Sequence, residues 1–419
     1  MSHTSSVGHR ALAGSQMLLV AFGALVLMPL VTGLDPNVAL FTAGIGTLIF
    51  QLCTGRMVPV FLASSFAFIS PILYSNTQFG LSATLGGLVA AGVLYMLLAG
   101  LVRLRGTDFI HRLLPPVVIG PVIMVIGLGL APLAANMAMG KTGDGATELV
   151  GYGTALIISG ASLLTTIVVA ILGRGIFRLL PILFGVAVGY GLSFAFGIVD
   201  TTKIAAAPWL AMPNFVTPTF EWAAILFMIP VAIAPVVEHI GDVVVISSVT
   251  GKNFVQKPGL HRTLLGDGLA TSAAAMVGGP PNTTYSEVTG AVVLTKNFDP
   301  RVMTWAAISA ILLAFVGKFG AALQAIPVPV MGGILCLLFG TIATVGLNTL
   351  VHRQVDLMIP RNLVIVSVTL VFGIGGLVLG GESLAFQGIA LAAITAIVLN
   401  LVLPGYKAAQ SQEQLRSEL

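Results

Sequence analysis

Apolar stretches of about 20 residues recur along the whole chain, and they constrain its fold more than any other feature. Each stretch is long enough to cross a bilayer as a helix. Only 8% of the residues are charged and the mean hydropathy is +1.03, whereas about a quarter of the residues of a soluble domain are charged. The sequence therefore predicts an all-α, polytopic integral membrane protein with about fourteen transmembrane segments. The expected segments are 12–33, 37–54, 58–71, 81–102, 114–134, 153–173, 179–199, 220–246, 260–277, 282–295, 302–320, 326–348, 362–380 and 385–404.

The distribution of basic residues predicts the orientation of these segments. With a cytoplasmic N-terminus, all of the 19 Lys and Arg residues except Lys141, Lys203 and Lys318 fall on cytoplasmic segments. This asymmetry is the positive-inside rule, so the net charge of +4 reflects topology and indicates no nucleic-acid partner. We expect a multi-pass protein of the cell (inner or plasma) membrane with cytoplasmic tails at 1–11 and 406–419. The apolar core of 12–33 is too long for a signal peptide, so it is predicted to be a retained span.

The fourteen segments divide into two halves of seven, 12–205 and 206–405. Because seven is odd, a duplicated half would enter the membrane in the opposite orientation, which predicts an inverted repeat. Each half carries an interrupted segment, MVPVFLASSFAFISPI at 57–72 and GGPPNTTYSEVTG at 278–290. Paired interruptions of this kind indicate the central binding site of a transporter. The alternative is a pair of proline-kinked helices with a structural role only.

The two interruptions also predict short strands. Irregular backbone at membrane depth is tolerated only where protein or a water-filled cavity satisfies its polar groups. An extended piece from each half can pair antiparallel at the centre of the molecule, and the pieces contain residues suited to strands, including Val60, Phe61, Thr283, Thr284 and Tyr285. Each piece would then lead into a helix whose free N-terminal amides face a ligand.

Acidic residues inside the apolar segments are the strongest functional signal. Glu238, Asp242 and Glu287 lie well within predicted spans, whereas Asp267 is expected near the cytoplasmic end of its span. A carboxylate at the bilayer centre costs roughly 2.5–3.5 kcal/mol, so these groups must be protonated, solvated or bound to something. Glu238 and Asp242 share one helical face, and neighbouring buried carboxyl groups favour proton uptake. The pattern indicates a proton-coupled carrier, with buried acids that only fix helix packing as the alternative.

Other chemistry is poorly supported by the sequence. His239 points about 100° away from Glu238 on a helix, which leaves a coupling role and a packing role equally open. No metal-ligand cluster is present, and Ser64 and Ser65 lack a nearby histidine for a membrane hydrolase. The MGKTGD stretch at 139–144 lacks the leading glycine of a phosphate loop. We therefore expect no enzyme activity, no metal, and no cofactor other than the coupling proton.

Four motifs together resemble the nucleobase–ascorbate transporter family, also called nucleobase:cation symporter-2. They are EHIGD (238–242), GLHRTLLGDGLAT (259–271), PNTTYSE (281–287) and PVPVMGG (327–333), and within the family the chain looks closest to bacterial uracil permeases. The resemblance implies fourteen spans divided into a core domain and a gate domain, with short antiparallel strands in the third and tenth spans. It also implies proton-coupled import of uracil by a homodimer.

The resemblance assigns roles residue by residue. Glu238 and Glu287 are expected to accept N–H hydrogen bonds from the base. Backbone amides near Phe66 and Ser286 are expected to meet its carbonyl groups, and Phe66 also lines the site. Tyr285 belongs to the same strand-to-helix turn. The position of Asp242 is the one that the resemblance links to proton coupling. Together with the buried residues of the same helix, the predicted proton-coupling residues are Asp242, Glu238 and His239.

The chain departs from the family pattern of uracil permeases in three ways. Asp242 stands where histidine is common, Ser286 and Val288 replace a glycine and an asparagine, and Gln16-Met17 stands where a Gln-His pair is usual. These differences bear on which base is carried and on the route of the proton.

A proton-coupled purine permease for xanthine or urate is therefore the alternative. Purine carriers of the family tend to have Phe and Gln at the positions of Tyr285 and Glu287, so the residues present favour a pyrimidine. A further alternative is an anion transporter of the same architecture, which the central acids disfavour.

Overall fold

The computed structural model describes residues 7–106, 112–381 and 384–405, and the side chains of Ala24, Ser286 and Leu384 lie outside that description. Within these described residues, seven helical stretches are long and apolar enough to cross a membrane, and four further apolar helices are shorter. The long stretches are Val7–Thr32, Pro36–Cys53, Leu81–Arg105, Pro116–Ala138, Tyr152–Leu172, Trp222–Thr250 and Val328–His352. The shorter ones are Pro181–Ala195, Pro300–Ala314, Pro360–Ile374 and Gly388–Val402. The prediction of a helical multi-pass membrane protein is confirmed.

The remaining predicted segments are also found. They are α14 (Leu260–Met276) and two helices that follow short strands, α4 (Ile69–Phe79) and α15 (Ser286–Thr295). The third predicted segment, 58–71, ended too early, because the helix that follows its strand continues to Phe79. The predicted C-terminal tail, 406–419, and residues 1–6 of the N-terminal tail lie outside the described residues.

Two pairs of strands interrupt the helices. Strand β1 (Leu62–Ser64) pairs antiparallel with β2 (Asn282–Thr284), with Leu62 opposite Thr284 and Ser64 opposite Asn282. This is the pairing between the two halves that the interrupted segments predicted. A second hairpin, β3 (Leu379–Gly381) with β4 (Leu384–Phe386), was not predicted. All six residues of the first pair are buried.

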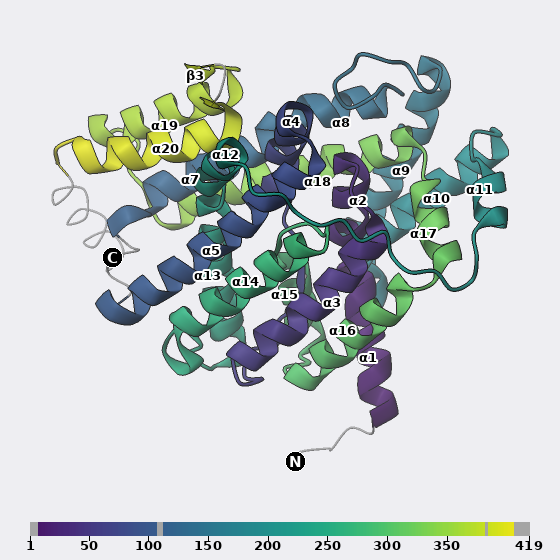
Figure 1. Ribbon diagram of the computed structural model, residues 1–419, viewed down its shortest axis with the longest axis horizontal. Helices are drawn as coiled ribbons and strands as arrows, with labels where there is room; N and C mark the ends of the chain where they lie inside the picture. The colour runs from purple at the N-terminus through teal and green to yellow at the C-terminus, as the bar shows by residue number, and fades with distance from the viewer. Residues whose placement is uncertain (1–6, 107–111, 382–383, 406–419) are drawn as a thin grey trace.

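Most helix contacts fall within two groups, each of which takes helices from both halves of the chain. The first group is α1 (Val7–Val20), α2 (Phe22–Thr32), α3 (Pro36–Cys53), α4, α5 (Leu81–Arg105), α12 (Trp222–Val231), α13 (Ile233–Thr250), α14, α15, α16 (Pro300–Ala314) and α17 (Gly317–Gln324). The second is α7 (Pro116–Gly129), α8 (Ala131–Ala138), α9 (Tyr152–Leu172), α10 (Pro181–Ala195), α18 (Val328–His352), α19 (Pro360–Ile374) and α20 (Gly388–Val402). Figure 1 shows α3, α14 and α5 side by side, and α19 next to α20.

Small residues let these helices approach closely, as is usual in membranes. On α18, a Cβ atom added to Gly333 would lie 2.2 Å from the Ser159 carbonyl oxygen of α9. Proline explains the break between α12 and α13, because Pro235 has no N–H to donate to the carbonyl group one turn earlier. Glu238 lies in the second turn of α13, after this break.

The connection between the two halves crosses one end of the first helix group. After the short helix α11 (Thr201–Ala206), residues 207–221 run without helix to α12, and Figure 1 shows this segment crossing the front of the molecule. Its amides bond to several helix ends, among them Thr219 N to Ser82 O at 2.9 Å. The Thr202 hydroxyl donates to Asp200 at the start of α11 and lowers the pKa of that carboxyl below its ordinary value.

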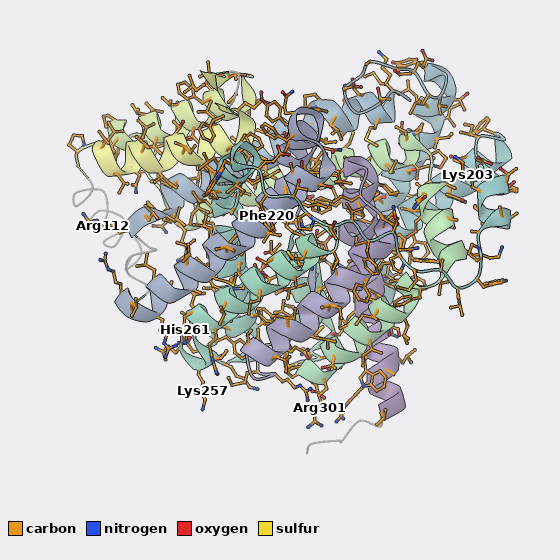
Figure 2. The ribbon with its side chains drawn as sticks, in the orientation of Figure 1. Arg112, Lys203, Phe220, Lys257, His261 and Arg301 are labelled. Atoms are coloured by element: carbon orange, nitrogen blue, oxygen red, sulfur yellow. The ribbon has the colours of Figure 1, made fainter. Side chains whose placement is uncertain are left out.

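Basic side chains collect at one edge of the molecule. Figure 2 shows Lys257, His261 and Arg301 along the edge that also carries the N-terminus, and Lys203 far from it. Arg112, which is also predicted to be cytoplasmic, lies away from that edge, at the left of this view.

Arg361 of α19 is hydrogen-bonded to the end of α20, which is in turn hydrogen-bonded to the segment before α7. Its side chain is 8% exposed, and Nη2 donates to the backbone oxygen of Asn400 at 2.7 Å and to its Oδ1 at 2.8 Å. Asn400 Nδ2 in turn donates to Arg112 O at 3.0 Å. The guanidinium therefore satisfies carbonyl groups at the end of α20 that have no helical partner.

Replacing Arg361 with alanine is expected to lower the free energy of unfolding by about 1–3 kcal/mol, because buried acceptors lose their donor. Thermal denaturation of the purified protein in detergent, followed by circular dichroism, measures this change. Arg353→Ala is the matched control, since Arg353 is exposed. Equal stability of the two variants would contradict the structural role of Arg361.

Candidate functional site

The paired strands β1 and β2 form the centre of the candidate site, and each leads directly into helical backbone. After β1, residues Phe66–Phe68 form a 3-10 turn (η1) that continues into α4, and after β2 the helix α15 begins at Ser286. The first amides of a helix have no partner within that helix. Two sets of free amides thus lie at the ends of the paired strands, where they can bind polar groups of a ligand.

Side chains from neighbouring helices satisfy the strand backbone. Thr47 Oγ1 accepts from Leu62 N at 2.9 Å, and Thr271 Oγ1 donates to Asn282 O at 2.6 Å. Asn282 Nδ2 donates to Thr42 O at 2.9 Å. These bonds replace the water that would otherwise be needed, which is why extended backbone can lie inside a membrane protein at this point.

Glu238 and Glu287 are brought together although they lie on different helices. Glu238 follows the α12–α13 break and Glu287 lies in the first turn of α15, and these two helices are in contact. Glu238 interacts electrostatically with Glu287, and also with Asp242 and Asp267. Glu238 is half-buried and Glu287 is accessible to solvent. Several carboxyl groups within reach of one another favour holding a proton or a hydrogen-bond donor between them.

Asp242 and His239 lie on the same helix as Glu238 but face different neighbours. Asp242 is one turn further along α13 and is 6% exposed. His239 is fully buried, and its Nδ1 lies 3.5 Å from Asp267 Oδ2 and 3.4 Å from Thr284 Oγ1. His239 therefore faces α14 and β2.

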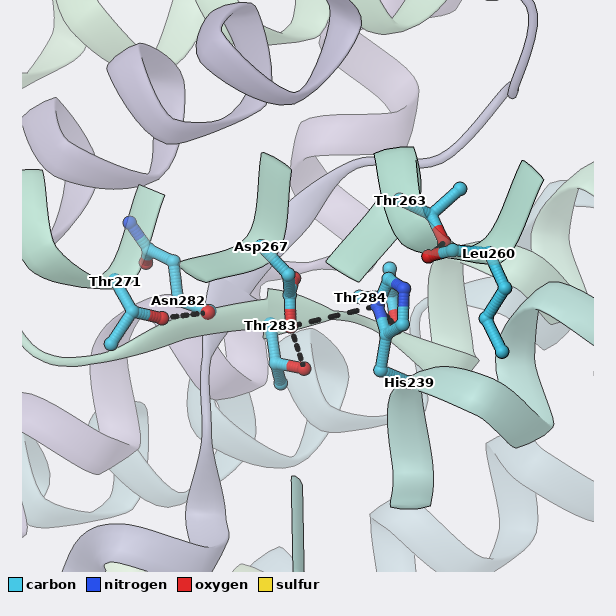
Figure 3. A network of polar contacts seen from close by, with 8 residues as sticks. All are labelled: His239, Leu260, Thr263, Asp267, Thr271, Asn282, Thr283 and Thr284. Atoms are coloured by element: carbon cyan, nitrogen blue, oxygen red, sulfur yellow. Dashed lines mark hydrogen bonds and ion pairs between the residues drawn. The ribbon is translucent and has the colours of Figure 1, made fainter. Parts of the chain in front are cut away.

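The sequence suggested that Asp267 lies near the end of its span, and the structure shows that this prediction is wrong. Asp267 is fully buried in the middle of α14, and Thr283 Oγ1 donates to its Oδ2 at 3.1 Å. The reason is tertiary, because β2 passes alongside α14 at the level of Asp267 and supplies the hydroxyl group. We call His239, Asp267, Thr283 and Thr284 the Asp267 network; Figure 3 shows it seen from close by.

Phe66 lies where the two helix groups meet. It is the first residue of η1, is 8% exposed, and its ring packs edge-to-face on Phe339 of α18 with 6.5 Å between centroids. The contact joins η1, which follows β1, to α18 of the second group. Phe339 was not singled out from the sequence, because it lies in an ordinary apolar helix and only its neighbour gives it significance.

Tyr285 and Ser286 form the turn from β2 into α15, as the resemblance implied. Tyr285 is extended and 4% exposed. A Cβ atom added to Gly23 would lie 3.6 Å from the Tyr285 hydroxyl oxygen, so this hydroxyl is close to the first span, which breaks between α1 and α2. Ser286 begins α15, but its side chain lies outside the described residues.

Among the residues that the structure describes, no group of three or more His, Cys, Asp and Glu side chains could hold a metal ion. The polar side chains around β2 carry carboxyl, hydroxyl and imidazole groups that contact one another. The arrangement is therefore suited to hydrogen-bonding a small polar molecule and to holding protons.

Comparison with known sequences shows the family. The model of the Permease family matches residues 8–383. The chain belongs to the nucleobase–ascorbate transporter family. It is therefore a membrane permease, and the resemblance drawn from its four motifs is confirmed.

Curated relatives cover nearly the whole permease. It is 55% identical over 398 residues to a probable uracil permease of Pasteurella multocida, which covers 95% of this chain and 94% of that one. It is 46% identical to a uracil permease of Bacillus caldolyticus, over 96% of this chain and 93% of the relative. It is 42% identical to the uracil permease of Escherichia coli, over 92% and 89%.

Solved structures share the fold at low sequence identity. The transmembrane domain of the cyanobacterial bicarbonate transporter BicA has a TM-score of 0.65 at 14% identity, and it covers 96% of this permease and 98% of that chain. The murine Solute Carrier 26 family member A9 anion transporter, in the inward-facing state, has a TM-score of 0.72 at 12% identity, over 96% and 69%. At such identity the likeness concerns the fold alone.

Proposed function

We propose that this permease imports a nucleobase, uracil, together with protons. The observation that carries the proposal is that α13, which carries Glu238, contacts both β2 and α15, whose first turn carries Glu287. The names of its relatives, uracil permeases at 42–55% identity, point to the same substrate.

A nucleobase lactam matches this set of groups. Uracil offers N–H donors next to C=O acceptors on one planar ring. Glu238 and Glu287 would accept from the N–H groups, while amides near Phe66 and Ser286 would donate to the carbonyl oxygens. Hydrogen bonds to carboxylates are among the stronger ones, and a carboxylate left unpaired discriminates against a molecule with the wrong edge. Phe66 and Tyr285 would line the site.

Asp242, Glu238 and His239 are the proposed proton-coupling groups. Glu238 and Asp242 interact along α13, so protonation of one favours the charged form of the other. Protonation would allow Glu238 to take the arrangement that binds the base, and release of the proton inside the cell would free it. Moving one charge across a membrane supplies about 2.3 kcal/mol per 100 mV.

Alternating access would use the two helix groups as core and gate. The first group carries both strands and all of the central acids, and the second covers it through contacts such as Phe66 on Phe339. Movement of the core against the gate would expose the site to each side in turn. The proposed repeats, 12–205 and 206–405, would be related by inversion, which accounts for a strand from each half at the centre.

The proposed setting is the plasma membrane of the cell, with both termini in the cytoplasm. The separation of Lys203 from Lys257 and Arg301 (Figure 2) agrees with the positive-inside rule for that orientation. A homodimer in the lipid bilayer is proposed on the resemblance to the family.

Uptake of radiolabelled uracil into proteoliposomes tests the substrate and the coupling together. We expect uracil to compete best among uracil, thymine, xanthine, hypoxanthine and urate. We also expect faster uptake when the external pH is lower than the internal pH, because the proton enters with the base. Preferential competition by xanthine or urate would favour the purine alternative. A conductance carried by anions in planar bilayers, without base uptake, would favour an anion transporter.

A further inference from the structure

Asp267 is a buried carboxyl group that the proposed mechanism does not use. It belongs to α14, whereas the groups assigned to the base and to the proton belong to α13, α15 and the strand ends. Burying such a group is unfavourable unless it is well hydrogen-bonded. Its two neighbours through Oδ2 are Thr283 Oγ1 at 3.1 Å and His239 Nδ1 at 3.5 Å.

These two neighbours lie close in sequence to the two site glutamates. His239 directly follows Glu238 on α13. Thr283 lies in β2, four residues before Glu287, and the turn at Tyr285 separates them. As Figure 3 shows, Asp267 lies between the strand residue Thr283 and the histidine on α13.

The same helix binds β2 a second time. Thr271 lies one turn after Asp267 on α14, and its hydroxyl donates to Asn282 O at 2.6 Å. Asp267 and Thr271 thus hold two successive strand residues, Asn282 and Thr283. These two bonds fix the position of β2 along α14. The contact of Asp267 with His239 fixes the position of α13 relative to the same helix.

We infer that Asp267 is a positioning residue that sets the spacing of Glu238 and Glu287 through His239 and Thr283. This inference rests on the proposed function, because the spacing matters when both glutamates bind one base. Asp267 acts as a hydrogen-bond acceptor in this role. Its negative charge is not required, because Thr283 needs an oxygen to donate to and an asparagine side chain supplies one.

The variants separate the acceptor from the charge. Asp267→Ala removes the acceptor, Asp267→Asn keeps an acceptor of nearly the same shape, and Thr283→Val removes the donor from the other side. Thr263→Val is the matched control, because Thr263 is fully buried on the same helix and its hydroxyl bonds to Leu260 O at 3.0 Å.

We expect the Kd for uracil to rise about tenfold in Asp267→Ala and in Thr283→Val, the loss of roughly one buried hydrogen bond. Asp267→Asn and Thr263→Val are expected to bind like the wild type. The double variant Asp267→Ala with Thr283→Val is expected to bind no more weakly than Asp267→Ala alone, because both changes remove one interaction.

Hydrogen exchange of the substrate-free protein tests the same inference without a ligand. Amides 282–287 are expected to exchange faster in Asp267→Ala and Thr283→Val, and at the wild-type rate in the other two variants. Unchanged exchange and unchanged Kd in a folded Thr283→Val would overturn the inference, as would an Asp267→Asn protein as impaired as Asp267→Ala. If the wild type bound no nucleobase, the proposed function would fail while the exchange measurement still decided the role of Asp267.

Discussion

Replacement of Glu238 by glutamine is expected to weaken uracil binding by about 10- to 100-fold. A hydrogen bond to a charged group is worth about 1.5–3 kcal/mol, and each 1.4 kcal/mol changes the affinity about tenfold. Glutamine keeps the size of the side chain but turns one acceptor oxygen into a donor. That donor would face an N–H group of the base, so the loss includes repulsion as well as a missing bond. Equilibrium binding of radiolabelled uracil to purified protein measures the change.

Glu221→Gln is the matched control for this experiment. Glu221 immediately precedes α12, at the start of the broken span that carries Glu238, and it is exposed. We expect this variant to bind uracil normally. Wild-type affinity in Glu238→Gln would remove Glu238 from the binding site, and the proposed recognition of the base would then be wrong.

Replacement of Asp242 by asparagine is expected to abolish concentrative uptake while leaving exchange of uracil for uracil intact. Asparagine cannot carry a proton, so the membrane potential can no longer drive the cycle through this position. In the wild type, one proton moving through 100 mV supplies about 2.3 kcal/mol, which supports roughly fifty-fold accumulation. Proteoliposomes with a potassium diffusion potential measure the accumulation, and counterflow of labelled uracil measures exchange.

Exchange serves as the internal control for the Asp242→Asn protein, because a misfolded variant would lose both activities. Asp144→Asn is the matched external control, since Asp144 is exposed in the loop before α9. The Asp144 variant is expected to accumulate uracil normally. Full accumulation by Asp242→Asn would show that the coupling proton is carried elsewhere.

The sequence predicted the parts of the fold that depend on local pattern. Runs of apolar residues placed the long apolar helices, and the interrupted segments 57–72 and 278–290 predicted the paired strands. Hairpin β3–β4 escaped prediction because its residues, including Gly380 and Gly381, carry no alternating pattern. The exact ends of α4 and α18 were also missed, since both helices continue past the apolar stretch that signals them.

The candidate site was predicted unevenly. Glu238, Asp242 and Glu287 stand out because an acid inside an apolar span is costly, and this cost can be seen without any structure. Thr283, Thr284 and Phe339 give no such signal, because threonine and phenylalanine are common in buried helices and strands. Their importance comes entirely from the residues that they face.

Composition and periodicity by themselves determined that this chain is a multi-pass membrane protein with acids at its centre, because hydropathy and helical spacing are properties of neighbouring residues. Only the tertiary structure decided which acids meet. It paired Leu62 with Thr284, brought Glu238 within reach of Glu287, and moved Asp267 from the expected end of a span to the middle of a polar network. These contacts join segments that are far apart in the chain, and their geometry is set by helix packing, which a linear pattern does not encode.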